Sequence, residues 1–257
     1  MTTKKRRKNK SNRCEMTFLE HLEELRWRLI KCIITIVVTM IGSFPFSKYI
    51  LHILTLPNNR LITPAKLIFL KPTGMLMVRV TIALVTGLII SSPVILYQLW
   101  KFISPGLLES EKRYIWPVIF FSTLCFLVGV VFSYFVMIPF ILPFLYSLAT
   151  ENIEPTLNIS EYIGFVTRLI LVTGLIFELP TLSFFFTRVG ILTPRILRRY
   201  RRYAVVLTFI AAAILTPPDP VSQLLLAGPL LLLYEISVLV SALAQRARVA
   251  GSQKLLQ

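Results

Sequence analysis

Long runs of apolar residues, separated by short polar segments, make up most of this chain. A helix that crosses a bilayer needs about 20 mainly apolar residues, or somewhat fewer where the bilayer thins. Six runs meet or approach this length, and we predict that each forms a transmembrane helix. They are residues 29–46, 80–100, 114–140, 162–187, 203–216 and 223–244.

The composition agrees with a membrane protein. Of the 257 residues, 55% are hydrophobic, and the mean hydropathy of +0.73 is more than the core of one soluble domain can bury. The net charge of +16 could indicate nucleic-acid binding, but the basic residues flank apolar runs and do not share one soluble face. We therefore expect an all-α integral membrane protein that binds lipid and no nucleic acid.

The distribution of charge predicts which connections face the cytoplasm. Lys and Arg favour that side in short loops. Basic residues crowd segments 1–15 and 188–202 and recur in 246–257, whereas the connection between the third and fourth runs is acidic. Segment 47–79 holds five basic residues and is an exception, but the rule is weaker for long loops. Both termini are thus predicted to lie inside (N-in/C-in).

We expect three parts along the chain. Residues 1–15 form a basic, disordered cytoplasmic tail, residues 16–245 form the six-helix transmembrane domain, and residues 246–257 form a cytoplasmic C-terminal tail.

The last two helices are predicted to be short. The 13 uncharged residues 204–216 rise about 20 Å as a helix, against about 30 Å of hydrocarbon. Pro217, Pro218 and Pro220 fix a rigid corner after them. Such a hairpin either thins the membrane locally or is packed this way for structural reasons alone, and the sequence does not decide between these two interpretations.

Glu178 lies in the middle of the fourth run, where a carboxylate costs about 2.5–3.5 kcal/mol on insertion scales. It is either a polar group in a cavity that meets a substrate or one partner of a helix–helix hydrogen bond. The Leu179–Pro180 step should kink the helix just after it. Gln223 and Glu235 in the sixth run pose the same question.

No pattern of metal-binding or catalytic residues is present. Cys14, Cys32 and Cys125 are scattered, and His21 and His52 lie outside the apolar runs. The runs hold no Ser/His or Asp/Asp pair. We therefore expect no metal, no cofactor and no enzymatic activity.

Two predicted cytoplasmic segments carry acids beside apolar or aromatic residues. Residues 17–20 form a capping-box pattern, followed by an apolar stripe and the acids Glu23 and Glu24. Segment 100–113 combines aromatic residues, a Pro-Gly turn and Glu109 and Glu111. Acids beside rings suit a peptide that carries arginines, because guanidinium pairs with carboxylate and stacks on aromatic faces. A solvated helix face and an interfacial aromatic anchor are the plainer interpretations.

These segments also resemble a known family. HLEELRWRL at 21–29, SSPVILYQLWKFISPGLLESEKR at 91–113, FELP at 177–180 and LTPPDPVSQ at 215–223 occur in one order. In this respect the chain is similar to the TatC family, the signal-receptor subunit of twin-arginine protein translocases. The similarity covers about residues 16–244.

The resemblance implies a cup-shaped six-helix receptor that binds twin-arginine signal peptides. Such a receptor recruits single-span partners of the TatA and TatB type, exports folded proteins with the proton-motive force and assembles into a homo-oligomer within a larger complex. It implies a peptide site of Glu111, Phe102, Glu24, Gln98 and Trp100, with Glu178 on the concave face. Gln223, together with Glu235, would dock a partner helix.

One segment departs from the family pattern. After Lys71–Pro72 the family commonly carries a Glu and a Phe, where this chain has residues 73–76, Thr-Gly-Met-Leu. Two alternatives also remain open: a secondary transporter with Glu178 as its midplane coupling carboxylate, and a pure assembly subunit. The host membrane is expected to be a bacterial cytoplasmic (inner) membrane or a plastid thylakoid.

Overall fold

The structure, a computed structural model, describes residues 18–61, 64–104, 112, 115–147, 156–215 and 220–254. These residues are almost entirely helical. The helices are α1 (Phe18–Ser43), α2 (Ser47–Asn59), α3 (Gly74–Ile103), α5 (Ile115–Phe132), α6 (Ile138–Ser147), α7 (Ile159–Ile176), α8 (Leu179–Val189), α9 (Pro194–Arg199), α10 (Arg201–Leu215) and α11 (Pro220–Lys254). A 3-10 turn, η1 (Phe44–Phe46), joins α1 to α2, and a π-helical turn, η3 (Ser133–Met137), joins α5 to α6.

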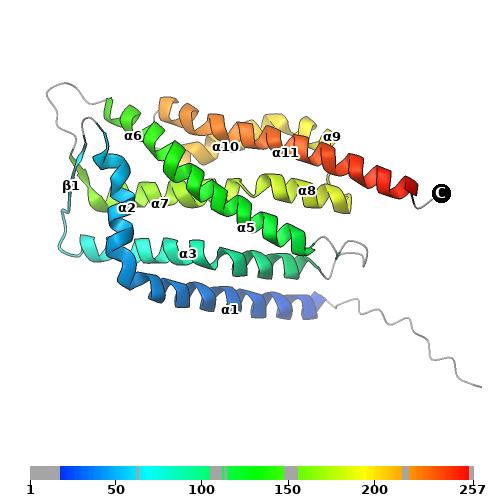
Figure 1. The fold of residues 1–257 in the computed structure, drawn as a ribbon, viewed down its shortest axis with the longest axis horizontal. Helices are drawn as coiled ribbons and strands as arrows, with labels where there is room; N and C mark the ends of the chain where they lie inside the picture. Colours follow the sequence, from blue (N-terminus) through cyan, green and yellow to red (C-terminus); the bar gives the residue numbers. More distant parts are fainter. Residues whose placement is uncertain are drawn as a thin grey trace, which may run out of the picture.

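The long helices run back and forth along one common direction (Figure 1). The start of α1 and the end of α11 lie at the same end of this bundle, which we call the terminal end. Within the described residues, five segments are long and apolar enough to span a membrane: Leu19–Asn59, Gly74–Ile103, Ile115–Ser147, Ile159–Val189 and Gln223–Ala247. Adding the shorter α10 gives six crossings, which agrees with an even number and with both termini on one side.

The predicted apolar runs coincide with these helices, but the two helices of the last pair differ in length. As expected, α10 is short, with 15 residues. The prediction of a short sixth helix is wrong, because α11 has 35 residues. The helix continues through residues 246–254, the segment that the sequence predicts to be the cytoplasmic C-terminal tail. No proline or glycine interrupts α11 between its apolar part and Arg248, so the backbone has no reason to stop at the membrane surface.

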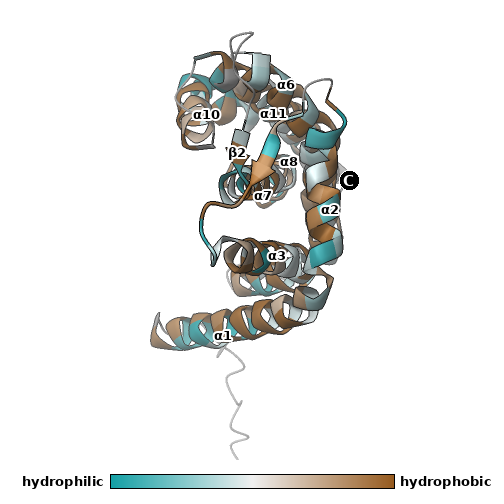
Figure 2. Cartoon of the chain, turned by 90° about the vertical axis from the view of Figure 1, so that its left-hand side faces the viewer, coloured by the Kyte–Doolittle hydropathy of each residue, from teal (hydrophilic) through white to brown (hydrophobic). Residues whose placement is uncertain are grey.

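Viewed along the helices, α1 and α3 lie at one side of the molecule and α10 and α11 at the other, with α7 between them (Figure 2). α1 is a peripheral helix, because only 6% of the most apolar 18-residue stretch in the segment Leu19–Asn59 is buried. The exposed apolar residues of α1 then face lipid in a membrane. This open arrangement is consistent with a cup, whose shape stays a prediction.

Close packing at Gly87 fixes α1 on α3. A Cβ atom on Gly87 would lie 2.8 Å from the backbone nitrogen of Met40 and 2.9 Å from its Cα. The Thr39 hydroxyl donates a hydrogen bond of 2.9 Å to the carbonyl of Gly87. A small residue is therefore needed on α3 for the two backbones to approach this closely.

Gly87→Ala should lower the thermal stability of the protein in detergent, since overpacking costs about 1–3 kcal/mol. Gly42→Ala is the matched control, because a Cβ there meets nothing within 4 Å and alanine favours the helix by about 0.5–1 kcal/mol. Equal melting temperatures for the two variants would show that α1 does not pack on α3 at Gly87.

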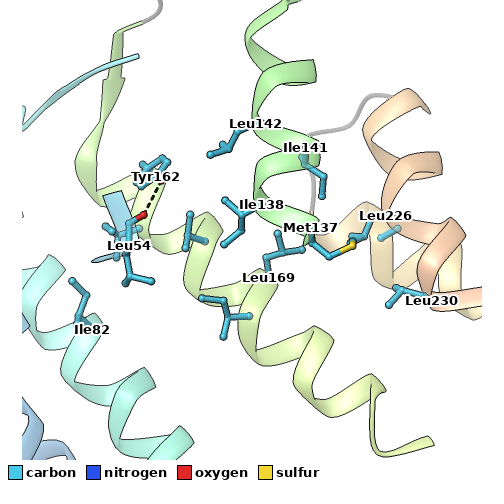
Figure 3. Packing of buried hydrophobic residues seen from close by; sticks show 14 of the residues in the cluster. Leu54, Ile82, Met137, Ile138, Ile141, Leu142, Tyr162, Leu169, Leu226 and Leu230 are labelled. Carbon is cyan, nitrogen blue, oxygen red and sulfur yellow. Dashed lines mark hydrogen bonds between the residues drawn. The ribbon is translucent and has the colours of Figure 1, made fainter. Parts of the chain in front are cut away.

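At the end of the bundle opposite the terminal end, hydrogen bonds join segments that are far apart in the sequence. The buried side chain of Asn58 pairs with the backbone of Ala65 at 3.0 and 3.2 Å and accepts a bond of 2.9 Å from the Tyr146 hydroxyl. The Tyr162 hydroxyl donates to the carbonyl of Leu54 at 2.9 Å (Figure 3). α2 is thereby tied to the chain near β1, to α6 and to α7.

Two three-residue strands, β1 (Lys66–Ile68) and β2 (Thr156–Asn158), pair in parallel at this opposite end. Next to the strands, buried apolar residues from several helices form the larger of two core clusters (Figure 3). Its fully buried members include Ile82, Ile138, Ile163 and Leu169. This end of the molecule is therefore the more extensively packed one, and hydrogen bonds connect its segments.

Candidate functional site

Helices α1 and α3 bring five polar or aromatic side chains together at the terminal end. These residues, His21, Glu24, Arg28, Gln98 and Phe102, are called the α1–α3 cluster below. Because residues four apart share one helix face, Glu24 and Arg28 point the same way from α1, and Gln98 and Phe102 do so from α3. Three residues expected at the peptide site, Glu24, Gln98 and Phe102, thus lie in one cluster.

The contacts within the cluster are polar and stacked. Arg28 Nε donates to Glu24 Oε1 at 2.9 Å, and Arg28 Nη2 also contacts this oxygen. Arg28 Nη1 donates to Gln98 Oε1 at 3.3 Å. The ring of His21 lies parallel to that of Phe102, with 4.3 Å between centroids and 12° between planes. The cluster therefore presents a carboxylate, an amide and an aromatic ring within one small area.

One oxygen of Glu24 keeps its capacity to bind. Glu24 Oε2 is buried and accepts no hydrogen bond from any residue that the structure describes. The imidazole Nδ1 of His21 lies 3.8 Å from this oxygen, beyond hydrogen-bond range. A buried carboxylate oxygen without a donor is costly, so this atom favours a ligand with an N–H group.

Trp100 differs from the sequence-based expectation of a peptide contact. Its side chain is 1% exposed, its indole nitrogen donates to Ser122 Oγ at 3.1 Å, and its ring meets that of Phe185 edge-on at 4.5 Å. Residues two apart on a helix point about 200° away from each other, so Trp100 faces the opposite side of α3 from Gln98 and Phe102. It packs against α5 and α8 and holds α3 in place.

Glu111, expected to be a main contact for the arginine pair, lies outside the described residues. Its role stays a prediction from the sequence.

Glu178 lies at the break between α7 and α8. As expected from Pro180, the helix ends at Ile176 and restarts at Leu179. The side chain of Glu178 is 6% exposed, and neither carboxyl oxygen accepts a hydrogen bond from a described residue. The Ser122 hydroxyl of α5 lies beside this carboxyl. Both interpretations of Glu178, a polar group in a cavity and a partner in a helix–helix contact, therefore stay predictions.

An apolar hollow of about 330 Å³ lies between α5, α8 and α11. Two of its lining residues, Pro180 and Thr181, closely follow Glu178 in the sequence. Its lining is Pro117, Val118, Phe121, Cys125, Pro180, Thr181, Phe184 and Val240. Apolar chains from lipid or protein can fill such a surface within a bilayer.

Gln223 and Glu235 make contacts inside their own hairpin. Gln223 Nε2 donates to the carbonyl of Phe209 at 2.8 Å, and Glu235 Oε2 pairs with Arg201 Nη2 at 2.7 Å. Both contacts join α10 to α11. The Glu235 side chain remains 46% exposed, so it is also accessible to another helix.

Sequence reasoning did not assign roles to Arg28, His21 and Ser122. The spacing could have indicated the first two, because His21 and Arg28 stand three residues before and four after Glu24. Ser122 carries no such signal, because its contact with Trp100 joins different helices.

The fold and these contacts define a multi-pass membrane protein with an acidic and aromatic cluster at one end of its bundle. A family model described as Sec-independent protein translocase protein (TatC) matches residues 20–229. The chain belongs to the TatC family, as its sequence motifs predict, and is a component of a Sec-independent protein translocase.

Individual relatives agree with this assignment. The chain is 42% identical to TatC of Helicobacter pylori over 227 residues, which cover 88% of each protein. It is 42% identical to TatC of Aquifex aeolicus over 236 residues, 90% of this chain and 97% of the relative. It is 39% identical to TatCy of Bacillus subtilis over 236 residues, 90% of this chain and 91% of that relative.

A solved structure described as the twin arginine translocase receptor TatC is also similar. It superposes with a TM-score of 0.81 at 41% identity and covers 88% of this chain and 99% of the solved one. The present chain is thus a multi-pass protein of the bacterial inner membrane and belongs to a protein-transport family. The alternative of a small-solute transporter has no support.

Proposed function

We propose that this chain is the receptor subunit that binds twin-arginine signal peptides for export of folded proteins. The α1–α3 cluster carries the proposal, because it gathers Glu24, Gln98 and Phe102 at the terminal end of the bundle. This end is the one predicted to face the cytoplasm. The solved relative named as the twin arginine translocase receptor supports the same role.

The chemistry of recognition is that of guanidinium groups. A guanidinium has a planar fork of N–H donors that pairs with carboxylate and stacks on an aromatic face. Glu24 Oε2 and the ring of Phe102 supply one such acceptor and one such face. Glu111 supplies the second carboxylate, so that two adjacent arginines meet two acids. Gln98 orients the site through its amide, and Trp100 supports it from inside the bundle.

The remaining polar groups serve the later steps of transport. The apolar part of the leader lies along the membrane helices near Glu178, and the short α10 thins the bilayer beside it. Gln223 and Glu235 dock single-span partners of the TatA and TatB type along the α10–α11 hairpin. Several copies of this chain assemble with these partners, and the proton-motive force drives export.

Site-specific crosslinking tests the receptor role directly. A photoreactive phenylalanine replaces Phe102 in the full chain, co-expressed with its small partners, and a reporter with a twin-arginine leader is supplied. We expect a crosslink to the leader that disappears when both leader arginines become glutamine.

Tyr49 is the matched control, because it is an aromatic residue, 71% exposed, on α2 at the opposite end of the bundle. A reporter that crosslinks equally at both positions, or at neither, would refute the proposed site. The crosslink itself separates a receptor from a passive assembly subunit, and export of the reporter in a strain that lacks its own counterpart tests the translocase function.

A further inference from the structure

Arg28 contacts the same groups that a ligand arginine would use. Its guanidinium shares three contacts: two with Glu24 Oε1 and one with the amide oxygen of Gln98. Two nitrogens converge on one carboxylate oxygen and the third reaches the amide, so one guanidinium links Glu24 on α1 to Gln98 on α3. The carboxylate of the site is thus neutralised by the protein itself before any peptide arrives.

The pair is not a solvated surface contact. The side chain of Arg28 is 13% exposed and that of Glu24 is 19% exposed. Exposed pairs at this spacing contribute little, but partial desolvation strengthens charge-assisted hydrogen bonds. A competing cation must therefore offer more than a single charge.

His21 covers what Arg28 leaves open. Its ring lies on the face of Phe102, and its Nδ1 lies 3.8 Å from Glu24 Oε2. His21 itself is 41% exposed, so it can move away without breaking a buried contact. A guanidinium that displaces this ring gains both the free oxygen and the aromatic face.

We propose that Arg28 is a specificity-determining residue that acts as an internal competitor for Glu24, with His21 as its exposed cover. This inference rests on the proposed function. Only a ligand with planar, multiply donating cations displaces these contacts. A lysine offers one compact charge that neither stacks nor binds in a fork, so Arg28 excludes leaders in which lysines replace the arginines.

Peptide binding to the purified full chain in nanodiscs tests this inference. The probes are two fluorescent synthetic leaders that differ only in an Arg-Arg or a Lys-Lys pair. In Arg28→Gln, the Kd of the Lys-Lys peptide should fall roughly tenfold, about what one charge-assisted hydrogen bond supplies. Binding of the Arg-Arg peptide should tighten less, so the preference for arginine shrinks.

Lys31→Gln is the matched control, because it removes the same charge from an exposed position of α1. Its preference for arginine should equal that of the wild type. An unchanged preference in Arg28→Gln, or the same change in Lys31→Gln, would overturn the proposal.

His21→Ala gives an independent measurement if Arg28→Gln fails to fold. It should tighten binding of the Arg-Arg peptide roughly threefold, because the ring of Phe102 and Glu24 Oε2 become accessible to the peptide. The expected gain is a fraction of one cation–ring contact. Weaker or unchanged binding would contradict the role of His21 as a cover. A wild type that binds a Gln-Gln leader as tightly as the Arg-Arg leader would instead refute the proposed function.

Discussion

Glu24→Lys should reduce export of a twin-arginine reporter by roughly 100-fold or more, since losing one partner of a partly buried charge pair costs about 2–5 kcal/mol in binding. Glu24 is the carboxylate of the α1–α3 cluster, and Arg28 already faces it. A lysine there would place two cations against each other and leave Arg28 without its acid. The same lysine would repel the arriving arginines.

Glu23→Lys is the matched control for this prediction. It makes the same change of charge one residue away, at an exposed position of α1. Export by Glu23→Lys should stay within about twofold of the wild type, because isolated surface charges contribute little. Membrane levels of both variants are measured alongside export. If the two variants export equally well, Glu24 is not part of the receptor site.

Trp100→Ala should destabilise the protein by about 3–5 kcal/mol, the usual cost of removing a buried aromatic side chain. Trp100 is 1% exposed, packs on Phe185 and donates its indole hydrogen to Ser122. The substitution leaves a cavity and an unpaired hydroxyl between α3, α5 and α8. Thermal unfolding in detergent measures the effect.

Trp27→Ala serves as the comparison, since Trp27 on α1 is 55% exposed and its removal opens no cavity. Trp100→Phe should fall between the two, because it keeps a ring but loses the hydrogen bond to Ser122. A contact role for Trp100 predicts the opposite pattern: weaker peptide binding at an unchanged melting temperature. That result would contradict the supporting role assigned to it.

The membrane-spanning helices could be predicted from the sequence because lipid imposes a simple requirement. Backbone groups in hydrocarbon must bond within the helix, so long apolar runs have one favourable structure. The kink at Pro180 followed from its missing N–H group. The ends of helices were harder, and α11 shows why: nothing in the sequence opposes its extension beyond the apolar part.

The β1–β2 pair and the orientation of α2 could not be predicted. Each strand has three residues, too few for a periodic pattern, and the paired residues, such as Lys66 and Thr156, stand 90 positions apart in the sequence. α2 contains Pro57 and is held by Asn58, whose hydrogen bonds depend on the folded neighbours. Such contacts belong to the tertiary structure and leave no local signal.

At the candidate site, residue types were predictable but their partners were not. Glu24, Gln98 and Phe102 came from matching motifs, and the structure brings them together. The helical spacing alone could have removed Trp100 from this face, because it stands two residues after Gln98. The i,i+4 spacing could have indicated the pairing of Arg28 with Glu24, but the contact of Arg28 with Gln98 joins two helices and leaves no local signal.

The close contact between Thr39 and Gly87 is a pivot point at which α1 crosses α3. From Thr39 to Glu24 the helix extends about 22 Å, and among the described residues its main packing partner is α3 (Figure 2). A rotation of about 5° around this pivot displaces the acid by about 2 Å, more than a hydrogen bond tolerates. The angle at which α1 crosses α3 at Gly87 therefore sets where the distant carboxylate lies relative to Gln98 and Phe102.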